Sequence, residues 1–163
     1  MRATLHFVFG KPGAGKTRLA RELAGRTPAV LFCEDEWLAA LNDPITSLPA
    51  YLAASRRARA VIAPMATRIL ALGTSVVFDF AANTVEGRAW VRSIFEAAGA
   101  DHVLHVLEVS DEECKRRVRE RNATRPAGLY FGDVSDALVE AVIPHIVPPS
   151  TAEGFTVSLG SGA

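Results

Sequence analysis

Short apolar runs alternate along the chain with longer stretches in which apolar residues recur every three or four positions. The apolar runs predict strands at residues 5–9, 29–33, 75–80, 103–109 and 154–159. The periodic stretches predict helices at residues 18–24, 51–72, 86–98, 110–122 and 135–141. Strands that alternate with helices in this way favour an α/β fold, with a parallel sheet covered by helices on both faces.

Prolines and glycines predict where these elements break or end. Pro64 should kink or interrupt the helix over residues 51–72, because proline lacks the amide hydrogen that a helix interior needs. Gly99 should end the helix that precedes it. The segment 38–49 holds two prolines and is expected to be a loop or a broken helix. Residues 160–163 are expected to form a small-residue tail without regular structure.

The segment between the first predicted strand and helix, GKPGAGKT (residues 10–17), matches the phosphate-binding pattern G-x-x-x-x-G-K-[ST] at every fixed position. Its glycines let consecutive amide groups point at phosphate oxygens, beside the positive end of a helix. Lys16 would reach the outer phosphates, and Thr17 would bind magnesium. An ordinary glycine turn is a poor alternative in this context, so the chain is expected to bind ATP with Mg²⁺. The residues expected to hold the nucleotide are Gly10, Gly13, Ala14, Gly15, Lys16, Thr17 and Arg18.

The third predicted strand ends in an aspartate, Asp79. Three of the four residues before it are strongly apolar, as in a Walker B strand whose aspartate belongs to the magnesium shell. A carboxylate suits this position because Mg²⁺ is a hard cation that prefers oxygen ligands. The alternative is an aspartate that only caps a turn. With the phosphate loop present, Thr17 and Asp79 are the predicted metal ligands.

Three consecutive carboxylates, Glu34, Asp35 and Glu36, follow the second predicted strand, with Trp37 next. Ligands bind at the carboxyl ends of the strands in such sheets, so these carboxylates would face a transferred phosphoryl group. A carboxylate there can accept the proton of an attacking hydroxyl. A solvated acidic loop is the alternative, and spacing does not decide which of the three would act. Trp37 could stack on a ring-shaped acceptor or belong to the core.

The densest basic stretch is the predicted helix over residues 110–122 and the loop after it. Arg117 and Arg121 are four residues apart and share one face of this helix, and Arg125 follows in the loop. Arginines from a mobile segment can neutralise charge on a transferred phosphoryl group and exclude water. The alternatives are a solvated face paired with nearby acidic residues, or a groove that follows a nucleic-acid backbone.

Two polar residues after the third strand could contact an acceptor. Asn83 lies just beyond the strand, and Arg88 lies on the next predicted helix. Asn83 and Thr84 could instead cap that helix. His6 and His105 alternate with apolar neighbours inside strands, and they are expected to be core histidines rather than catalysts.

Composition and charge narrow the class of protein. The chain has 163 residues, of which 49% are hydrophobic and 22% charged, as in a globular protein of one domain. That domain is expected to span residues 1–159. The formal net charge is zero, so no overall field would attract nucleic acid or a membrane. Fifteen of the 18 basic residues are arginines, a bias that suits phosphate recognition but also arises from genomic composition.

The two cysteines, Cys33 and Cys114, stand in no metal-ligand spacing and are expected to be buried thiols, as in a reducing cytosol. No apolar run reaches transmembrane length, and the N-terminal region lacks the pattern of a signal peptide. The expected location is the cytoplasm.

Taken together, these segments resemble the small P-loop kinases related to polynucleotide kinase, zeta toxin and chloramphenicol phosphotransferase. The resemblance covers most of the chain and rests on GKPGAGKT, CEDEW, VVFDFAAN and ECKRRVRERNATRP. It implies a three-layer P-loop NTPase sandwich with a mostly parallel five-stranded sheet and an arginine-bearing lid. It also implies that Asp35 is the base toward the acceptor hydroxyl, that Asp79 is the Walker B-like aspartate and that Asn83 matches a polar position after it. The implied lid arginines are Arg117, Arg121 and Arg125.

The leading hypothesis is a kinase that moves the γ-phosphoryl group of Mg-ATP to a hydroxyl on a small molecule, such as an antibiotic, a sugar or a nucleoside. A second hypothesis is an ATPase switch that acts on a protein partner, for which the carboxylates at residues 34–36 would be dispensable. A third is a nucleic-acid 5′-hydroxyl kinase, which zero net charge and an aromatic content of 7% disfavour.

Overall fold

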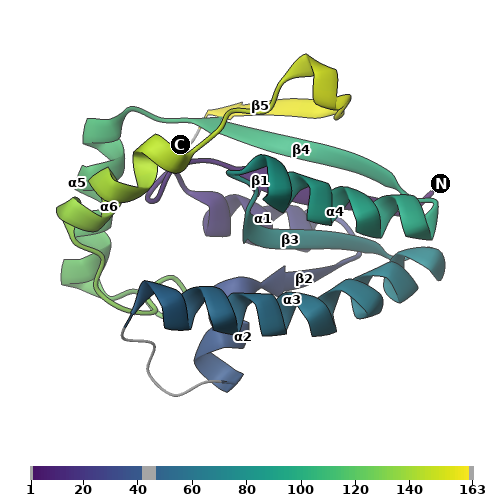
Figure 1. The fold of residues 1–163 in the computed structure, drawn as a ribbon, viewed down its shortest axis with the longest axis horizontal. Coiled ribbons are helices and arrows are strands. Elements are labelled where there is room, and N and C mark those ends of the chain that lie inside the picture. The colour runs from purple at the N-terminus through teal and green to yellow at the C-terminus, as the bar shows by residue number, and fades with distance from the viewer. Residues whose placement is uncertain (1, 42–46, 162–163) are drawn as a thin grey trace.

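The computed structural model describes residues 2–41 and 47–161 (Figure 1). Its centre is a five-stranded parallel sheet with the strand order β2-β3-β1-β4-β5. The strands are β1 (Thr4–Phe9), β2 (Ala29–Cys33), β3 (Ser75–Ala81), β4 (Asp101–Glu108) and β5 (Val157–Ser161). The helices are α1 (Lys16–Arg26), α2 (Glu34–Leu41), α3 (Leu48–Ala71), α4 (Val85–Ala98), α5 (Asp111–Thr124) and α6 (Asp136–Val142), and two 3₁₀ turns cover Ile143–His145 and Thr151–Glu153.

Helices cover both faces of the sheet and give the fold three layers (Figure 1). Helices α3 and α4 lie on one face and α1 lies on the other, while α5 and α6 lie beyond the carboxyl ends of the strands. The predicted α/β sandwich around a parallel sheet is therefore confirmed. Within residues 2–41 and 47–161, no helix is both long and apolar enough to cross a bilayer.

The main core lies between the sheet and the layer formed by α3 and α4. Alternate residues of β1, Leu5, Phe7 and Phe9, point into it, as the two-residue period of a strand requires. Phe78 of β3 stacks on Trp90 of α4 with ring centroids 5.3 Å apart. Helix α3 contributes a buried stripe at four-residue spacing, which consists of Ala54, Ala58, Ile62, Ala66 and Leu70.

The strand order brings three segments of the sequence to one edge of the sheet. Strand β3 lies between β2 and β1, and Cys33 at the end of β2 pairs in register with Asp79 of β3. The carboxyl ends of parallel strands share an edge. The phosphate loop after β1, the acidic residues after β2 and Asp79 are therefore neighbours.

Two details differ from the sequence-based predictions. Helix α3 runs without a break through Pro64, so the predicted interruption is wrong. Its buried stripe packs along the sheet, and this packing offsets the cost of about 3 kcal/mol that proline imposes on a helix interior. The acidic residues 34–36 form the first turn of α2, a helix that the sequence-based predictions did not include. Carboxylates in a first helical turn interact favourably with the helix dipole.

The segment 38–49 is partly helical, because residues 38–41 end α2 and residue 48 begins α3. Residues 42–46, where a loop was expected, lie outside the described residues. At the other end of the chain, β5 covers Val157–Ser161, so residues 160 and 161, which were expected in the tail, belong to a strand.

Arg88 of α4 is fully buried, and its guanidinium group joins three segments of the backbone. Nε donates a hydrogen bond to Glu153 at 2.7 Å, and Nη2 donates a second one to the same carboxylate at 2.9 Å. Nη1 donates to the carbonyl oxygens of Ala82 at 3.0 Å and Val147 at 2.8 Å. This ion pair ties the end of β3 to the segment that precedes β5.

Replacing Arg88 by leucine is expected to lower the free energy of unfolding by about 3–5 kcal/mol, because it leaves the Glu153 carboxylate and two carbonyl groups without their partner. Urea denaturation of the wild type and Arg88→Leu measures this loss. Arg26→Ala is the matched control, since the exposed Arg26–Glu22 pair should contribute less than about 1 kcal/mol. Equal stabilities of the two variants would contradict the assignment.

His6 of β1 and His105 of β4 contact each other across neighbouring strands. Nδ1 of His6 and Nε2 of His105 lie 3.1 Å apart, so one ring donates a hydrogen bond and the other accepts it. Burial, followed by the charge of His6, lowers the pKa of His105 to about 4, and burial also lowers the pKa of His6. Both rings are thus neutral structural groups at neutral pH, in line with the expected role.

This pair should make the fold sensitive to acid. The unfolded chain binds a proton at His105 with an ordinary pKa near 6.5, whereas the folded chain resists protonation down to about pH 4. Stability should therefore fall as the pH decreases from about 6.5 to about 4, by about 1–2 kcal/mol for this residue. Urea denaturation across this range should show a weaker pH dependence for His105→Gln than for the wild type. An unchanged pH dependence in His105→Gln would contradict the expectation.

Candidate nucleotide and phosphoryl-transfer site

The phosphate loop connects β1 directly to α1, and its glycines are required by geometry. Gly13 and Gly15 have φ angles of 82° and 99°, in the left-handed region that other residues avoid. A side chain on Gly13 would also collide with the carbonyl oxygen of Cys114 in α5. Lys11 forms an ion pair with Asp111 and donates to the Val109 carbonyl oxygen at 3.2 Å. Helix α5 therefore packs directly on the loop.

Lys16 lies at the first position of α1 and folds back across the loop. Its ammonium group donates hydrogen bonds to the carbonyl oxygens of Gly10 at 2.7 Å and Lys11 at 2.9 Å. Burial lowers the pKa of Lys16 to about 8, and the carboxylates of Asp79 and Asp35 oppose this shift. The lysine thus keeps most of its charge at neutral pH and lies close to both acidic residues.

Asp79 is 8% exposed, and Cys33 of the neighbouring strand orients it. The Cys33 thiol donates a hydrogen bond to Oδ2 of Asp79 at 3.2 Å. Burial, together with this carboxylate, raises the pKa of the thiol to about 12, so the thiol stays protonated. Among the described residues nothing donates a hydrogen bond to Oδ1 of Asp79. The Asp79 carboxylate and the Thr17 hydroxyl are oxygen ligands of the kind that Mg²⁺ prefers, so this donor set fits the predicted metal.

The three acidic residues at the start of α2 have different surroundings. Glu34 is 5% exposed and accepts hydrogen bonds from three residues of α3. The donors are the Ser55 hydroxyl, the Tyr51 hydroxyl at 3.4 Å and Nε of Arg59 at 3.3 Å. Glu36 accepts a hydrogen bond from Arg21 of α1 at 2.6 Å. Both carboxylates are therefore engaged by protein groups.

Asp35 is the carboxylate that remains. In the part of the chain that the structure describes, its side chain makes no hydrogen bond or ion pair. Burial raises the pKa of Asp35, as do the charges of Asp79 and Glu34, while Arg121 and Lys16 lower it. Asp35 is thus within electrostatic reach of the lysine, the candidate metal ligand and an arginine of α5.

The basic residues of α5 divide into two sets. Arg117 and Arg121 lie on the side of the phosphate loop: Nη1 of Arg117 lies 3.9 Å from where a Cβ of Gly15 would be, and the charge of Arg121 acts on Lys16. Nε of Arg121 is buried and has no hydrogen-bond partner among the described residues. The other set forms ion pairs away from the loop: Lys115 with Glu140, Arg116 with Glu113 and Glu120, and Arg119 with Asp136.

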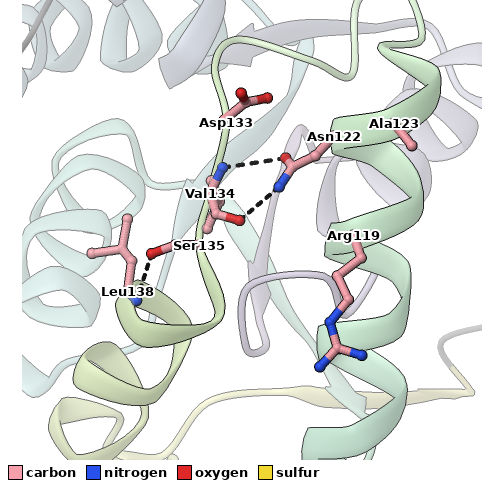
Figure 2. A pocket seen from close by; sticks show the side chains of 7 residues that line it. All are labelled: Arg119, Asn122, Ala123, Asp133, Val134, Ser135 and Leu138. Carbon is pink, nitrogen blue, oxygen red and sulfur yellow. Dashed lines mark hydrogen bonds between the residues drawn. The ribbon is translucent and has the colours of Figure 1, made fainter.

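The loop after α5 is fastened to that helix, as Figure 2 shows. Asn122 donates a hydrogen bond to the carbonyl oxygen of Val134 at 2.7 Å and accepts one from its amide at 3.2 Å. Ser135 then caps α6 by accepting a hydrogen bond from the Leu138 amide. An open pocket of about 600 Å³ lies between these elements; its lining residues are Arg119, Asn122, Ala123, Asp133, Val134, Ser135 and Leu138.

Arg21 was not singled out from the sequence, yet it connects this loop to the acidic helix. Its Nη2 donates hydrogen bonds to Glu36 of α2 at 2.6 Å and to the carbonyl oxygen of Gly128 at 2.7 Å. The available signal was spacing, because Arg21 lies one helical turn after Thr17 on α1. Gly128 has a φ angle of 76°, and any side chain there would collide with Arg21.

Several predicted site residues have other surroundings. Arg88 does not face an acceptor, because it is fully buried and bound to Glu153 and two carbonyl groups. Trp37 packs against Phe32 with ring centroids 6.0 Å apart, as the core alternative expected. Arg125 lies over Tyr130 and pairs with the exposed Asp133 at 3.6 Å, away from the loop.

Two further residues that were predicted for the site, Arg18 and Asn83, lie beside the phosphate loop. Arg18 follows Thr17 on α1 and is exposed. Asn83 is turned toward the loop instead of an acceptor: its amide nitrogen donates to the Gly10 carbonyl oxygen at 2.9 Å, and its Oδ1 accepts from the Gly10 amide at 3.0 Å. Thr84, and not Asn83, caps α4.

The phosphate loop directly precedes α1, and β3, the strand that carries Asp79, lies between β1 and β2 in the sheet. This arrangement is the fold of the P-loop kinases. The chain belongs to the family described as an AAA domain, whose model matches residues 5–143. No curated protein matches the sequence.

Solved structures share this fold. A candidate kinase from Chloroflexus aurantiacus superposes with a TM-score of 0.76 at 20% identity, over 99% of this chain and 89% of that one. Kti12 from Chaetomium thermophilum, in complex with ADP-AlF3, superposes with a TM-score of 0.69 at 18% identity, over 96% of this chain and 88% of that one. The APS kinase CysC of Mycobacterium tuberculosis, in complex with AMPPNP and APS, superposes with a TM-score of 0.55 at 19% identity, over 88% of this chain and 97% of that one. The resemblance to small P-loop kinases is confirmed for the fold.

Proposed function

We propose that this protein is an ATP-dependent kinase that transfers the γ-phosphoryl group of Mg-ATP to a hydroxyl group of a small molecule. The observation that carries the proposal is Asp35. It is a carboxylate without a protein partner among the described residues, and it lies within electrostatic reach of Lys16, Asp79 and Arg121. The nucleotide complexes of Kti12 and of the APS kinase, two proteins of the same fold, support ATP as the donor.

The residues suggest a role for each part of the site. The amide groups of residues 10–17 and Lys16 would hold the phosphates, and Thr17 and Asp79 would hold Mg²⁺, which neutralises phosphate charge. Asp35 would accept the proton of the acceptor hydroxyl. The hydroxyl oxygen would then bond to the γ-phosphorus, while the bond from that phosphorus to the ADP oxygen breaks. Arg117 and Arg121 would stabilise the charge on the transferred group.

The remaining features fit a small acceptor and a reducing compartment. The formal net charge of zero offers no overall attraction to a nucleic-acid backbone. Cys33 and Cys114 are both free and buried, as in proteins of the cytoplasm, which we propose as the location. To act as a lid arginine, Arg125 would have to leave its ion pair with Asp133.

The test follows γ-labelled ATP with Mg²⁺ across a pool of sugars, nucleosides, antibiotics and 5′-hydroxyl oligonucleotides. Lys16→Met serves as the control for contaminating kinases. Label on a small hydroxyl compound, lost in Lys16→Met, is the expected result. Label on the oligonucleotides would overturn the small-molecule assignment, and label found only in free phosphate would overturn transfer in favour of an ATPase switch.

A further inference from the structure

The buried side chain of Asn83 holds both backbone groups of Gly10, the first residue of the phosphate loop. Asn83 is 9% exposed and lies just after β3. Its amide group forms two hydrogen bonds with Gly10: one to the carbonyl oxygen at 2.9 Å and one from the amide nitrogen at 3.0 Å. Both backbone groups of Gly10 are thereby fixed at the point where β1 becomes the loop.

The carbonyl oxygen that Asn83 holds is also the one that Lys16 contacts. The Lys16 ammonium group donates to the Gly10 oxygen at 2.7 Å, so this oxygen accepts hydrogen bonds from both side chains. A shift of the Gly10 peptide group would move the anchor of the lysine. Asn83 therefore acts on the phosphate-binding lysine through one backbone atom.

Asn83 is linked to the buried Arg88 ion pair through the backbone of Val147. The carbonyl oxygen of Asn83 accepts a hydrogen bond from the Val147 amide at 2.8 Å. Arg88 holds the carbonyl oxygens of Val147 and Ala82, and Glu153 holds Arg88. Asn83 and the preceding residue, Ala82, are thus connected by hydrogen bonds to the segment before β5.

We propose that Asn83 is a positioning residue for the nucleotide, which sets the geometry of the phosphate loop and of Lys16. The proposal rests on nucleotide binding by residues 10–17 but not on phosphoryl transfer. Asparagine suits this role because one amide group supplies a donor and an acceptor together. Aspartate would keep the bond from the Gly10 amide, but it would place a carboxylate against the Gly10 carbonyl oxygen.

The test measures the dissociation constant of Mg-ATP by calorimetry, with no acceptor present, for the wild type, Asn83→Asp and Thr84→Ala. Thr84 is the neighbouring residue and caps α4 by accepting a hydrogen bond from the Gly87 amide at 3.0 Å, so its loss lowers stability without touching the loop. Asn83→Asp should weaken Mg-ATP binding at least tenfold, whereas Thr84→Ala should change it less than twofold at a comparable loss of melting temperature. Wild-type affinity in Asn83→Asp, or equal losses in both variants, would overturn the proposal.

A second variant covers the case in which Asn83→Asp does not fold. Asn83→Ser keeps a small polar side chain but is too short to bridge both groups of Gly10. Hydrogen exchange followed by mass spectrometry should show faster exchange in residues 10–17 of this variant and unchanged exchange in α4. Faster exchange spread equally over both segments would show a general loss of stability and contradict the positioning role. Neither experiment uses an acceptor. Both would therefore still test the role of Asn83 if the kinase assignment failed.

Discussion

Asp35→Asn is expected to lower the rate of phosphoryl transfer by about 100- to 10,000-fold while Mg-ATP still binds. The amide of asparagine has nearly the shape of the carboxylate but cannot accept the proton of the acceptor hydroxyl. ATP affinity should be kept or increased, because the change removes a negative charge near Lys16 and the phosphates. Steady-state transfer to the identified acceptor and calorimetric titration with Mg-ATP measure the two effects.

Glu36→Gln is the matched control for this experiment. Glu36 is the next residue on the same helical turn, but it pairs with Arg21, whereas Asp35 has no such partner among the described residues. Its replacement should reduce the transfer rate by less than about tenfold, in keeping with the small energy of exposed ion pairs. If Glu36→Gln lost activity and Asp35→Asn kept it, the base would have been assigned to the wrong carboxylate.

The phosphate loop could be predicted from the sequence because its geometry depends on local residues. Gly13 and Gly15 adopt backbone angles that only glycine tolerates well, and Lys16 begins the helix that points at the loop. The strands were predicted for a similar reason, since β2 and β3 read as largely apolar runs and β3 is buried over most of its length. In both cases a short stretch of sequence contains the information.

The distinction among the acidic residues could not be predicted, because it depends on tertiary contacts. Glu34 becomes structural through Tyr51, Ser55 and Arg59, which lie on α3 between 17 and 25 positions away. Their spacing from Glu34 carries no recognisable pattern. Asp35 is left as the candidate base only after the packing of α3 against α2 has engaged its neighbour.

The roles of the polar residues after β3 depend even more on contacts between segments that are distant in the sequence. Asn83 contacts Gly10 across 73 positions of sequence, and Arg88 contacts Glu153 across 65. Polar residues near a predicted ligand site suggest ligand contacts, but in a small α/β domain they also satisfy backbone groups at strand ends. Burial decides between these roles, and burial is set by segments distant in the sequence.

Arg121→Ala is expected to lower the maximal rate of phosphoryl transfer by about 1,000-fold or more, with a smaller effect on the affinity for ATP. The charge of Arg121 acts on both Lys16 and Asp35, the residues that we propose to bind the phosphates and to accept the proton. Its Nε is buried without a hydrogen-bond partner among the described residues. A buried donor without a partner is costly unless a ligand supplies one, and a phosphoryl oxygen would do so.

The neighbouring arginines provide the comparison. Arg119 pairs with Asp136 at the protein surface, so Arg119→Ala should leave the rate within about threefold of the wild type. Arg117 lies near Gly15 but shares its charge with Glu113, at 2.6 Å, and Arg117→Ala should have an intermediate effect. Rates that fell equally for Arg119→Ala and Arg121→Ala would mean that these side chains act only by stabilising α5.

The form of the kinetic defect separates the possible roles of Arg121. If its guanidinium group binds the transferred phosphoryl group mainly in the transition state, the maximal rate and its ratio to KM for ATP should fall together. A higher KM at an unchanged maximal rate would assign Arg121 to ground-state nucleotide binding. Arg121→Lys should restore only part of the rate, because an ammonium group cannot reproduce the paired hydrogen bonds of a guanidinium group to phosphate.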